Sequence, residues 1–301
     1  MSRRRTGNKV DGWVILDKPV GLGSTPAVGK VRRLFGADKA GHGGTLDPLA
    51  SGVLPIALGE ATKTVPFVMD GRKEYRFTLR FGEARSTDDG EGEVVATSPG
   101  RPTDDQIAAA LPRFLGEIEQ MPPAFSALKI NGRRAYDLAR AGEVVDLAPR
   151  RVRIDALRLI GRPDADHADL VVSCGKGTYI RSLGRDLAQA LGTVGHLSAL
   201  RRTRAGPFAE DAAISLPKLE SLGHIPALSG ALAPVATALD DIPALALTEA
   251  QADRLRQGQP VFLTRDAPPS GTLLRAETGS KLVALVRCDA AAVKPVRVFN
   301  L

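Results

Sequence analysis

Residues 41–63 read GHGGTLDPLASGVLPIALGEATK. A single aspartate, Asp47, stands between a run of glycines and Pro48, and no second carboxylate follows it until Glu60. Glycine allows backbone shapes and close approaches that side chains forbid, and proline fixes the chain directly after the aspartate. Because apolar residues flank the loop and anchor it, the stretch predicts one carboxylate held rigidly beside an apolar wall.

The residues alone leave several roles open for Asp47. An aspartate commonly caps a turn or a helix, a role that needs no other residue. A metal site would need more carboxylates or histidines close by. A glycosidase-like pair would need a second carboxylate, which Asp88 or Asp89 could supply. A lone carboxylate suits nucleophilic attack or the stabilisation of charge.

The composition is ordinary for a globular protein, but the charge is not. The chain has 301 residues, of which 43% are hydrophobic and 25% charged, enough for one large domain and one small one. The net charge of +7 favours a polyanionic partner, either nucleic acid or an acidic membrane surface, although an arginine-rich genome would give the same bias. Each basic cluster is by itself typical of a solvated face, and together they suit an RNA recognised by its shape: 3–5, 32–33, 133–134, 150–153 and 201–204.

Several classes of protein are disfavoured. The two cysteines lie far apart and only four histidines are present, so neither a structural zinc site nor a disulfide framework is expected. The basic N-terminus lacks the apolar core of a signal peptide. The most apolar later stretch, 227–239, is too short and too broken by glycine and proline to span a membrane. We therefore expect a cytoplasmic protein without a metal.

Hydrophobic periodicity predicts strands and helices that do not alternate strictly. Strands are expected at 12–19, 73–83, 155–161 and 168–177, and helices at 24–36, 103–116 and 178–192. Ser24 or Thr25 is expected to cap the first helix, and Gly36 to end it. The strand at 73–83 and the segment after it suggest a hairpin. This pattern favours an α+β fold with a largely antiparallel central sheet and flanking helices.

The chain is expected to contain three parts. Residues 1–10 form a basic tail, residues 11–240 a main domain, and residues 244–301 a small β-rich module, with an Ala/Pro-rich boundary at 225–243. Thr248 and Gln251 form a capping pattern at the start of this module.

Residues 41–63 closely resemble the aspartate motif of the TruB family of pseudouridine synthases, which act on tRNA. Four further motifs follow the family's order: GWVILDKPVGLGST, KEYRFTLRFGEARSTDDGEG, QMPPAFSALKINGRRAYDLARAGE and SCGKGTYIRSLGRDL. Together they run from about residue 11 to residue 208, and five ordered motifs are hard to obtain by chance. The last sixty residues resemble a PUA domain, an RNA-binding β-module. One departure is Phe125, where the family often has tyrosine.

The resemblance implies a pseudouridine synthase fold and the isomerisation of uridine at position 55, in the T loop of tRNA, without a cofactor. It implies that Asp47 is the essential residue and Arg181 its partner, although Arg181 alone would read as a solvated residue at a helix start. Tyr75 would stack on the base and handle a proton, where the residues alone favour an ordinary strand aromatic.

The resemblance also implies residues that bind the substrate. His42 would help to hold the RNA loop with its base turned out, whereas a lone histidine is usually structural. Tyr179 and Leu200 would line the pocket, although both would otherwise be assigned to the core. The segment 121–153 would close over the RNA loop. The expected partner is the T-arm stem-loop of tRNA, bound by a monomer without an obligatory protein partner and without a membrane.

Two other classes of function are compatible with these residues. One is an RNA-binding chaperone that uses the same pocket and whose role does not depend on catalytic turnover. The other is a guide-dependent RNA synthase, which the lack of long basic tails disfavours.

Overall fold

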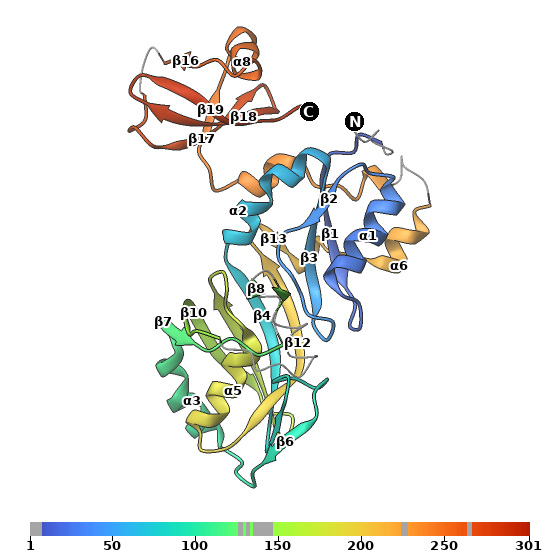
Figure 1. Ribbon diagram of the computed structural model, residues 1–301, viewed down its shortest axis with the longest axis vertical. Coiled ribbons are helices and arrows are strands. Elements are labelled where there is room, and N and C mark those ends of the chain that lie inside the picture. Colours follow the sequence, from blue (N-terminus) through green and yellow to red (C-terminus); the bar gives the residue numbers. More distant parts are fainter. Residues whose placement is uncertain (1–7, 126–128, 131–132, 135–146, 224–227, 264–266) are drawn as a thin grey trace.

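The computed structural model describes residues 8–125, 129–130, 133–134, 147–223, 228–263 and 267–301. The molecule is elongated, with a long sheet running through most of its length and a smaller β module at one end (Figure 1). Residues 1–7 of the expected basic tail, and much of the segment 121–153 that would close over the RNA, lie outside the described residues.

The large sheet has ten strands. Its main path runs in the order β14 (Ile214–Ser215), β1 (Gly12–Lys18), β3 (Ser51–Leu58), β12 (Gly195–Ala205), β4 (Lys73–Phe81), β11 (His167–Cys174), β10 (Arg150–Gly161) and β7 (Gly116–Gln120). Two short strands join it from the side, β2 (Ala40–His42) on β3 and β13 (Phe208–Ala209) on β12. The pairs β1–β14 and β3–β12 are parallel, and the other neighbours are antiparallel. The expected mixed, largely antiparallel sheet is confirmed.

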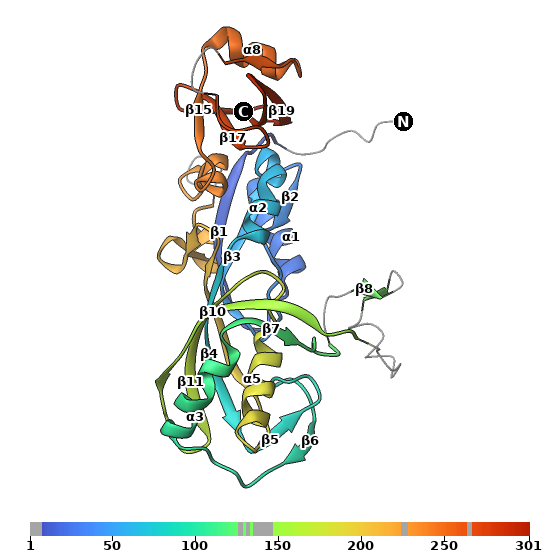
Figure 2. The same ribbon diagram turned by 90° about the vertical axis from the view of Figure 1, so that its left-hand side faces the viewer.

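Short helices cover this sheet. They are α1 (Ser24–Phe35), α2 (Val65–Asp70), α3 (Asp104–Ala110), α5 (Ile180–Ala190) and α6 (Leu216–Ser221), with 3-10 turns η1 (Gly59–Thr64), η2 (Leu111–Phe114), η3 (Glu210–Ala212) and η4 (Val235–Leu239). Figure 2 shows α1 and α2 on one side of the sheet and α6 on the other. Among the described helices, none combines the length and apolar character needed to cross a lipid bilayer.

The first helix begins differently from the expectation. Neither Ser24 nor Thr25 caps α1, because the N-cap is Gly23 and makes no side-chain capping bond. The Ser24 hydroxyl instead donates to the backbone carbonyl of Leu46 and accepts from its N–H, both at 2.8 Å. Those two buried backbone groups need partners, so the serine serves the neighbouring loop rather than its own helix. Gly36 ends the helix in the left-handed conformation, as expected.

The expected hairpin after 73–83 is also rearranged. Strand β4 pairs with β11 and β12, not with the segment that follows it. That segment forms a separate two-stranded sheet from β5 (Glu83–Arg85) and β6 (Val94–Thr97). A central position suits β4, because its alternate residues Phe77, Leu79 and Phe81 are buried. A second small pair, β8 (Lys129–Ile130) and β9 (Arg133–Arg134), lies within the basic segment.

The C-terminal module is a five-stranded sheet with its own core. The strands β15 (Ala244–Ala246), β16 (Val261–Phe262), β17 (Leu273–Thr278), β18 (Lys281–Asp289) and β19 (Ala292–Val298) lie in the order β15-β17-β18-β19-β16. Helix α8 (Glu249–Arg256) opens with the expected capping box of Thr248 and Gln251. Leu255, Ala276 and Val286 are among the residues of the module's core. The β-rich character expected of this segment is confirmed.

The module is joined to the large sheet by packing as well as by the chain. Leu285 and Phe299 belong to a core cluster that also contains Trp13 and Val53 of the large sheet. The Lys63 ammonium on η1 donates to the backbone carbonyl of Val298 at 2.8 Å.

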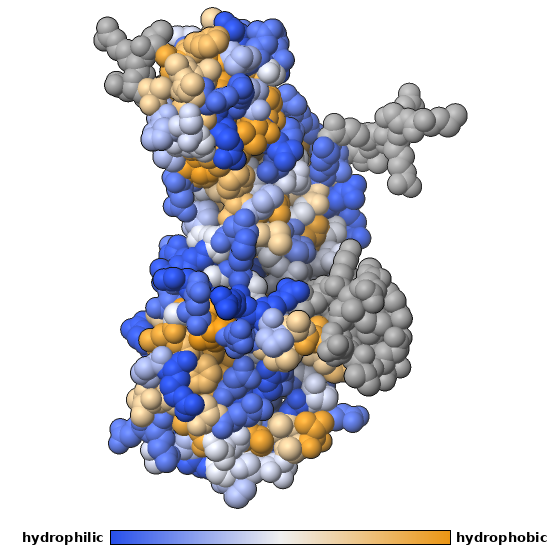
Figure 3. Space-filling view, turned by 60° about the vertical axis from the view of Figure 1, so that its left-hand side comes forward, coloured by the Kyte–Doolittle hydropathy of each residue, from blue (hydrophilic) through white to orange (hydrophobic). Residues whose placement is uncertain are grey.

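The space-filling view in Figure 3 shows hydrophilic side chains gathered across the middle of the molecule, between this module and the opposite end.

Candidate active site

One cavity collects most of the residues that the sequence singled out. It has a volume of about 590 Å³, and its lining includes Asp47, Tyr75, Tyr179, Arg181 and Leu200. These residues come from the loop before β3, from β4, from the start of α5 and from β12. Strand order, rather than proximity along the chain, therefore assembles the candidate site.

Asp47 and Arg181 form an ion pair in this cavity. Arg181 Nη2 lies 2.9 Å from Asp47 Oδ2, and the aspartate side chain keeps 38% of its surface exposed. The turn around Asp47 is closed by its backbone carbonyl, which accepts the N–H of Ala50 at 3.1 Å. The carboxylate thus faces the arginine and the open cavity instead of capping the turn.

Arg181 is a buried residue that connects several segments. Its side chain is 5% exposed, which overturns the alternative of a solvated helix-start arginine. It donates to the backbone carbonyls of Thr87 and Phe125, both at 2.8 Å. Arg181 contacts the backbone of Phe125, not its side chain. This hydrogen bond is therefore kept although the family often has tyrosine at that position.

A second carboxylate contacts the same guanidinium. Asp89 Oδ2 lies 3.4 Å from Arg181 Nη1, and the Asp89 side chain is 3% exposed. A buried cation between two carboxylates compensates charges that would otherwise be costly to bury. Asp89 therefore belongs to the charge network around Arg181, but it is not among the residues that line the cavity. In the described ranges, no group of three His, Cys, Asp or Glu side chains is placed to hold a metal ion.

Tyr75 lies opposite Arg202 in the register of β4 and β12. Burial raises the pKa of the Tyr75 phenol above its ordinary value, and the nearby Arg202 charge only partly opposes this shift. The phenol therefore remains protonated near neutral pH. Leu200, 7% exposed, forms an apolar part of the wall.

His42 ends β2 and lies just outside the lining, while its neighbour Gly44 is part of it. The N–H of Gly44 donates to Nδ1 of His42 at 3.4 Å. Burial, followed by the charge of Arg202, lowers the pKa of His42. The imidazole is therefore neutral near pH 7, and the structure places it beside the cavity rather than in it.

The sequence assigned Arg202 to a solvated basic cluster, and this assignment is wrong. Arg202 is 1% exposed. Its guanidinium donates to the carbonyls of Val53 at 2.7 Å, Gly44 at 3.0 Å and Thr45 at 3.3 Å. It thereby ties both ends of the Asp47 loop to β12. Its spacing from Leu200 indicates that the two side chains share a face of the strand, but not that this face is buried.

Lys18 is a second buried cation that contacts the loop. It is fully buried, and its ammonium donates to the carbonyls of Leu22 at 2.6 Å, Pro19 at 2.9 Å and Pro48 at 3.4 Å. Burial lowers the pKa of Lys18 to about 8, although the Asp47 charge opposes the shift. Lys73, which lines the cavity, shows the same effect, because burial and then the Arg202 charge lower its pKa to about 8.

Most of the chain, from residue 32 to residue 299, matches models of one protein family. Residues 32–180 match the N-terminal domain of TruB family pseudouridylate synthases. Residues 181–240 match the tRNA pseudouridylate synthase B C-terminal domain, and residues 243–299 match the C-terminal model of pseudouridine synthase II TruB.

Similar proteins span the full chain. The tRNA pseudouridine synthase B of Caulobacter vibrioides is 54% identical over 309 residues, covering 100% of both chains. The protein of the same name from Bradyrhizobium diazoefficiens is 58% identical over 304 residues, covering 99% of this chain and 88% of the relative.

Chains of solved multi-component complexes share the fold. A chain of an H/ACA RNP bound to a substrate RNA containing 2′-deoxyuridine is 25% identical, with a TM-score of 0.75, covering 100% of this chain and 92% of that one. A chain of a Cbf5–Nop10–Gar1 complex is 28% identical, with a TM-score of 0.74, covering 96% of this chain and 84% of that one.

Proposed function

The chain belongs to the TruB family of pseudouridylate synthases, and from this we propose that it isomerises uridine to pseudouridine at position 55, in the T loop of tRNA, with Asp47 as the essential carboxylate. The observation that carries the proposal is the 2.9 Å contact between Asp47 and Arg181 in a cavity also lined by Tyr75 and Leu200. The cavity volume of about 590 Å³ is of the size that small ligands such as a nucleoside occupy.

The proposed reaction breaks the bond between N1 of the uracil and C1′ of the ribose, turns the base, and joins C5 to C1′. C5 loses a proton and N1 gains one, so no electrons or groups are exchanged and the proposal includes no cofactor. The Asp47 carboxylate adds to the base, adds to the ribose, or assists elimination to a glycal. All three routes need the carboxylate in a fixed direction, and the contact of Arg181 Nη2 with Asp47 Oδ2 at 2.9 Å supports this orientation.

Tyr75 has two roles in this proposal. Its ring stacks on the target base, and its protonated phenol exchanges a proton with the sugar. Leu200 and Tyr179 provide the remaining walls of the pocket for the base.

The target base must leave its stack before Asp47 can reach the glycosidic bond, at a cost of roughly a few kcal/mol. Stacking on Tyr75 and contact with His42 offset part of this cost. The neutral imidazole of His42, with its lowered pKa, suits stacking against the RNA loop at the edge of the cavity better than it suits an ionic contact with phosphate.

In this proposal, residues 11–240 form the catalytic domain and residues 244–301 form a PUA-like module that contacts the RNA backbone away from the T loop. The protein acts as a cytoplasmic monomer on the T-arm of tRNA and needs no protein partner. Arg256, Arg275 and Lys294 of the module already form ion pairs with acidic neighbours. The contacts with phosphate therefore fall to other basic residues of the module, such as Arg254, Lys281 and Arg297.

An RNA chaperone that uses the same pocket is the second candidate. The ion-pair network of Asp47, Arg181 and Asp89 favours the enzyme, because binding an RNA loop does not require two carboxylates on one guanidinium.

The proposal is tested by incubating the purified protein with unmodified tRNA transcript and mapping pseudouridine by carbodiimide-dependent primer extension. We expect one new stop, at position 55. Asp47→Asn preserves size but removes the charge and the nucleophile, so turnover should vanish while tRNA affinity stays within about tenfold, since phosphate contacts supply most of it.

Asp105→Asn is the matched control, because it makes the same chemical change on the exposed surface of α3 and should leave turnover unchanged. Appreciable isomerisation by Asp47→Asn would rule out the proposed role of Asp47. Tight tRNA binding by the wild type without any stop would favour the chaperone.

A further inference from the structure

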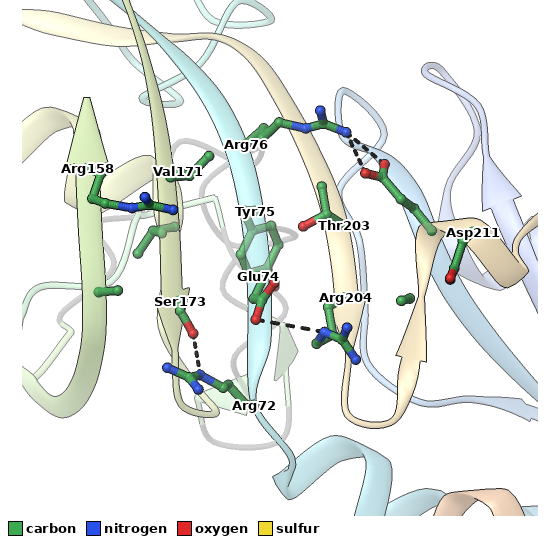
Figure 4. Close-up of a pocket in the computed structure, with 14 residues that line it drawn as sticks. Arg72, Glu74, Tyr75, Arg76, Arg158, Val171, Ser173, Thr203, Arg204 and Asp211 are labelled. Atoms are coloured by element: carbon green, nitrogen blue, oxygen red, sulfur yellow. Dashed lines mark hydrogen bonds and ion pairs between the residues drawn. The ribbon is translucent and has the colours of Figure 1, made fainter. Parts of the chain in front are cut away.

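A second hollow lies on the opposite face of the same sheet. It has a volume of about 480 Å³ and lies over β4, β10, β11 and β12. Along β4, Tyr75 points into the candidate active site, so its neighbours Glu74 and Arg76 point to the other face, because successive strand residues alternate. Both are part of the hollow's lining and are drawn in Figure 4.

Short side chains line the bottom of the hollow, and long side chains surround it. Val171, Ser173 and Ala156 form part of the floor, and four arginines rise around it: Arg72, Arg76, Arg158 and Arg204. We call this feature the arginine groove. Side-chain exposures of 53% for Arg72, 49% for Arg76 and 40% for Arg204 leave the guanidinium groups open to solvent.

At one end of the groove, a carboxylate already lies between two arginines. Arg76 lies opposite Arg201 in the β4–β12 register, and like charges at such positions destabilise a sheet. Glu210 resolves the conflict by lying between them. Its carboxylate accepts from Arg76 at 2.6 and 2.8 Å and from Arg201 at 3.1 Å. An oxyanion between two guanidinium groups is therefore a stable arrangement on this face.

At the other end of the groove, Arg158 has no ion pair among the described residues, whereas Arg72 Nε lies 3.5 Å from Asp155 Oδ2. Arg158 lies opposite Val171, which lies opposite Arg76, so Arg158 is two strands from Arg76, or about 10 Å. Figure 4 shows its side chain reaching from β10 towards Val171, with no dashed contact. Arg72 uses Nε to contact Ser173, and Arg204 lies 3.8 Å from Glu74. Arg158 is therefore the arginine of the groove whose donors stay available to a ligand.

We propose that the arginine groove binds the phosphodiester backbone of RNA, in a segment other than the T loop held in the candidate active site. This inference rests on the proposed function, which makes RNA the substrate. Arginine forks match the oxygens of a phosphate, and an open trough with a low floor suits a chain that passes through it. Glu74 on β4 and Asp211 on η3 also line the groove and repel phosphate, so the backbone runs on the side of β10, where Arg158 lies.

The test compares Arg158→Glu with the wild type on full-length tRNA and on an isolated T-arm stem-loop. We expect the affinity for full-length tRNA to fall about tenfold, and the slope of log affinity against log salt to decrease by roughly 0.7–0.9 per lost phosphate contact. Binding and turnover of the stem-loop should be unchanged. Arg158→Lys keeps the charge and should recover most of the affinity.

Arg113→Glu is the matched control, since Arg113 is an exposed arginine on η2 and the change in net charge is the same. Equal losses in Arg113→Glu and Arg158→Glu would overturn the proposal, as would unchanged binding of full-length tRNA by Arg158→Glu or equal losses on tRNA and stem-loop. Inorganic phosphate that competes as well as RNA at the same phosphate concentration would also overturn it, in favour of a free anion.

Failure of the groove and failure of the proposed function give different results. If the groove is wrong but the function is right, Arg158→Glu modifies both RNAs as the wild type does. If the function is wrong, the wild-type protein forms no pseudouridine on either RNA, whatever Arg158→Glu does to binding.

Discussion

Buried cations, not solvated ones, shape the candidate active site at the scale of single residues. Arg181 contacts two carboxylates, whereas Arg202 and Lys18 contact backbone carbonyls around the Asp47 loop. Glycine and proline limit the shapes of this loop, but these long-range hydrogen bonds hold it in one of them. The rigidity expected from the loop sequence thus depends on side chains far away in the chain.

Arg202→Lys should uncouple the loop from β12. Lysine keeps the charge but loses the planar fork that reaches three carbonyls, so Asp47 loses its fixed direction. We expect kcat on the T-arm stem-loop to fall by about tenfold to a hundredfold, because a small misplacement of a reacting group is costly. KM should change by less than about threefold, since the phosphate contacts remain.

Arg201→Lys is the control for that experiment, because Arg201 is the adjacent arginine and forms ion pairs with Asp17 and Glu210 on the other face. It should retain stem-loop turnover within about twofold. If Arg202→Lys behaved like Arg201→Lys, Arg202 would not position the loop.

The lowered pKa values of Lys18 and Lys73 predict a pH dependence of stability. Both are about 8 in the folded protein, whereas the unfolded chain keeps these protons up to about pH 10.4. Between these values the folded state binds fewer protons, so the free energy of unfolding rises with pH, by at most about 1.4 kcal/mol per pH unit for each group. The stability lost to these buried charges is greatest below pH 8.

Lys18→Met removes one of the two groups and should flatten this rise, as measured by urea unfolding between pH 8 and about pH 10. Lys218→Met, at an exposed lysine of α6, should leave the slope as it is in the wild type. An unchanged slope in Lys18→Met would contradict the assignment.

At the scale of secondary-structure elements, the contact between β3 and β12 joins the Asp47 loop to the strand of Leu200 and Arg202. These strands meet in parallel at Ser51 and Gly52, opposite Arg201 and Arg202. Gly52 has φ +97°, and a Cβ there would lie 2.2 Å from the backbone oxygen of Arg202. The close approach of the two backbones therefore requires glycine at this position.

Gly52→Ala should lower the free energy of unfolding by about 2 kcal/mol or more, because it combines a clash with an unfavourable φ. Gly29→Ala is the matched control, since Gly29 is inside α1 and a Cβ there meets no atom within 4 Å. It should stabilise by up to about 1 kcal/mol. Urea unfolding of both variants measures the difference, and equal effects would contradict the close approach.

At the scale of the whole molecule, the C-terminal module is packed onto the large sheet. Phe299 is 3% exposed and lies in a core cluster with Trp13, while the Glu60 carboxylate accepts the N–H of Asn300 at 2.8 Å. Deleting the module would expose part of this cluster, so loss of activity after deletion would not by itself show a role in RNA binding. Point variants separate the two effects.

Phe299→Ala should destabilise this junction by about 3 kcal/mol, the usual cost of removing a buried phenylalanine side chain. Thermal unfolding and limited proteolysis at 240–243 measure the loosening. Phe262→Ala changes an exposed phenylalanine of the same module, 65% exposed, and should leave both readouts unchanged. If the two variants behaved alike, the packing of Phe299 would not hold the module in place.

Features that depend on a few neighbouring residues could be predicted from the sequence. The end of α1 at Gly36, the capping box at Thr248 and the alternation along β4 were all predicted correctly, because such signals rest on φ, ψ and hydrogen bonds within one turn or one strand. The ordered motifs likewise indicated the family and brought attention to Asp47, Tyr75 and Arg181.

Which distant groups meet depends on the tertiary structure. The order and register of the strands bring Asp89 to Arg181 and set the direction of the Arg202 side chain. They also place Ser24 beside the backbone of Leu46 and form the arginine groove. A basic residue looks the same in the sequence on either face of a strand. Arg202 holds the loop because its face of the sheet is buried and backbone carbonyls there accept its hydrogen bonds. Arg158 stays open to solvent because its face is exposed.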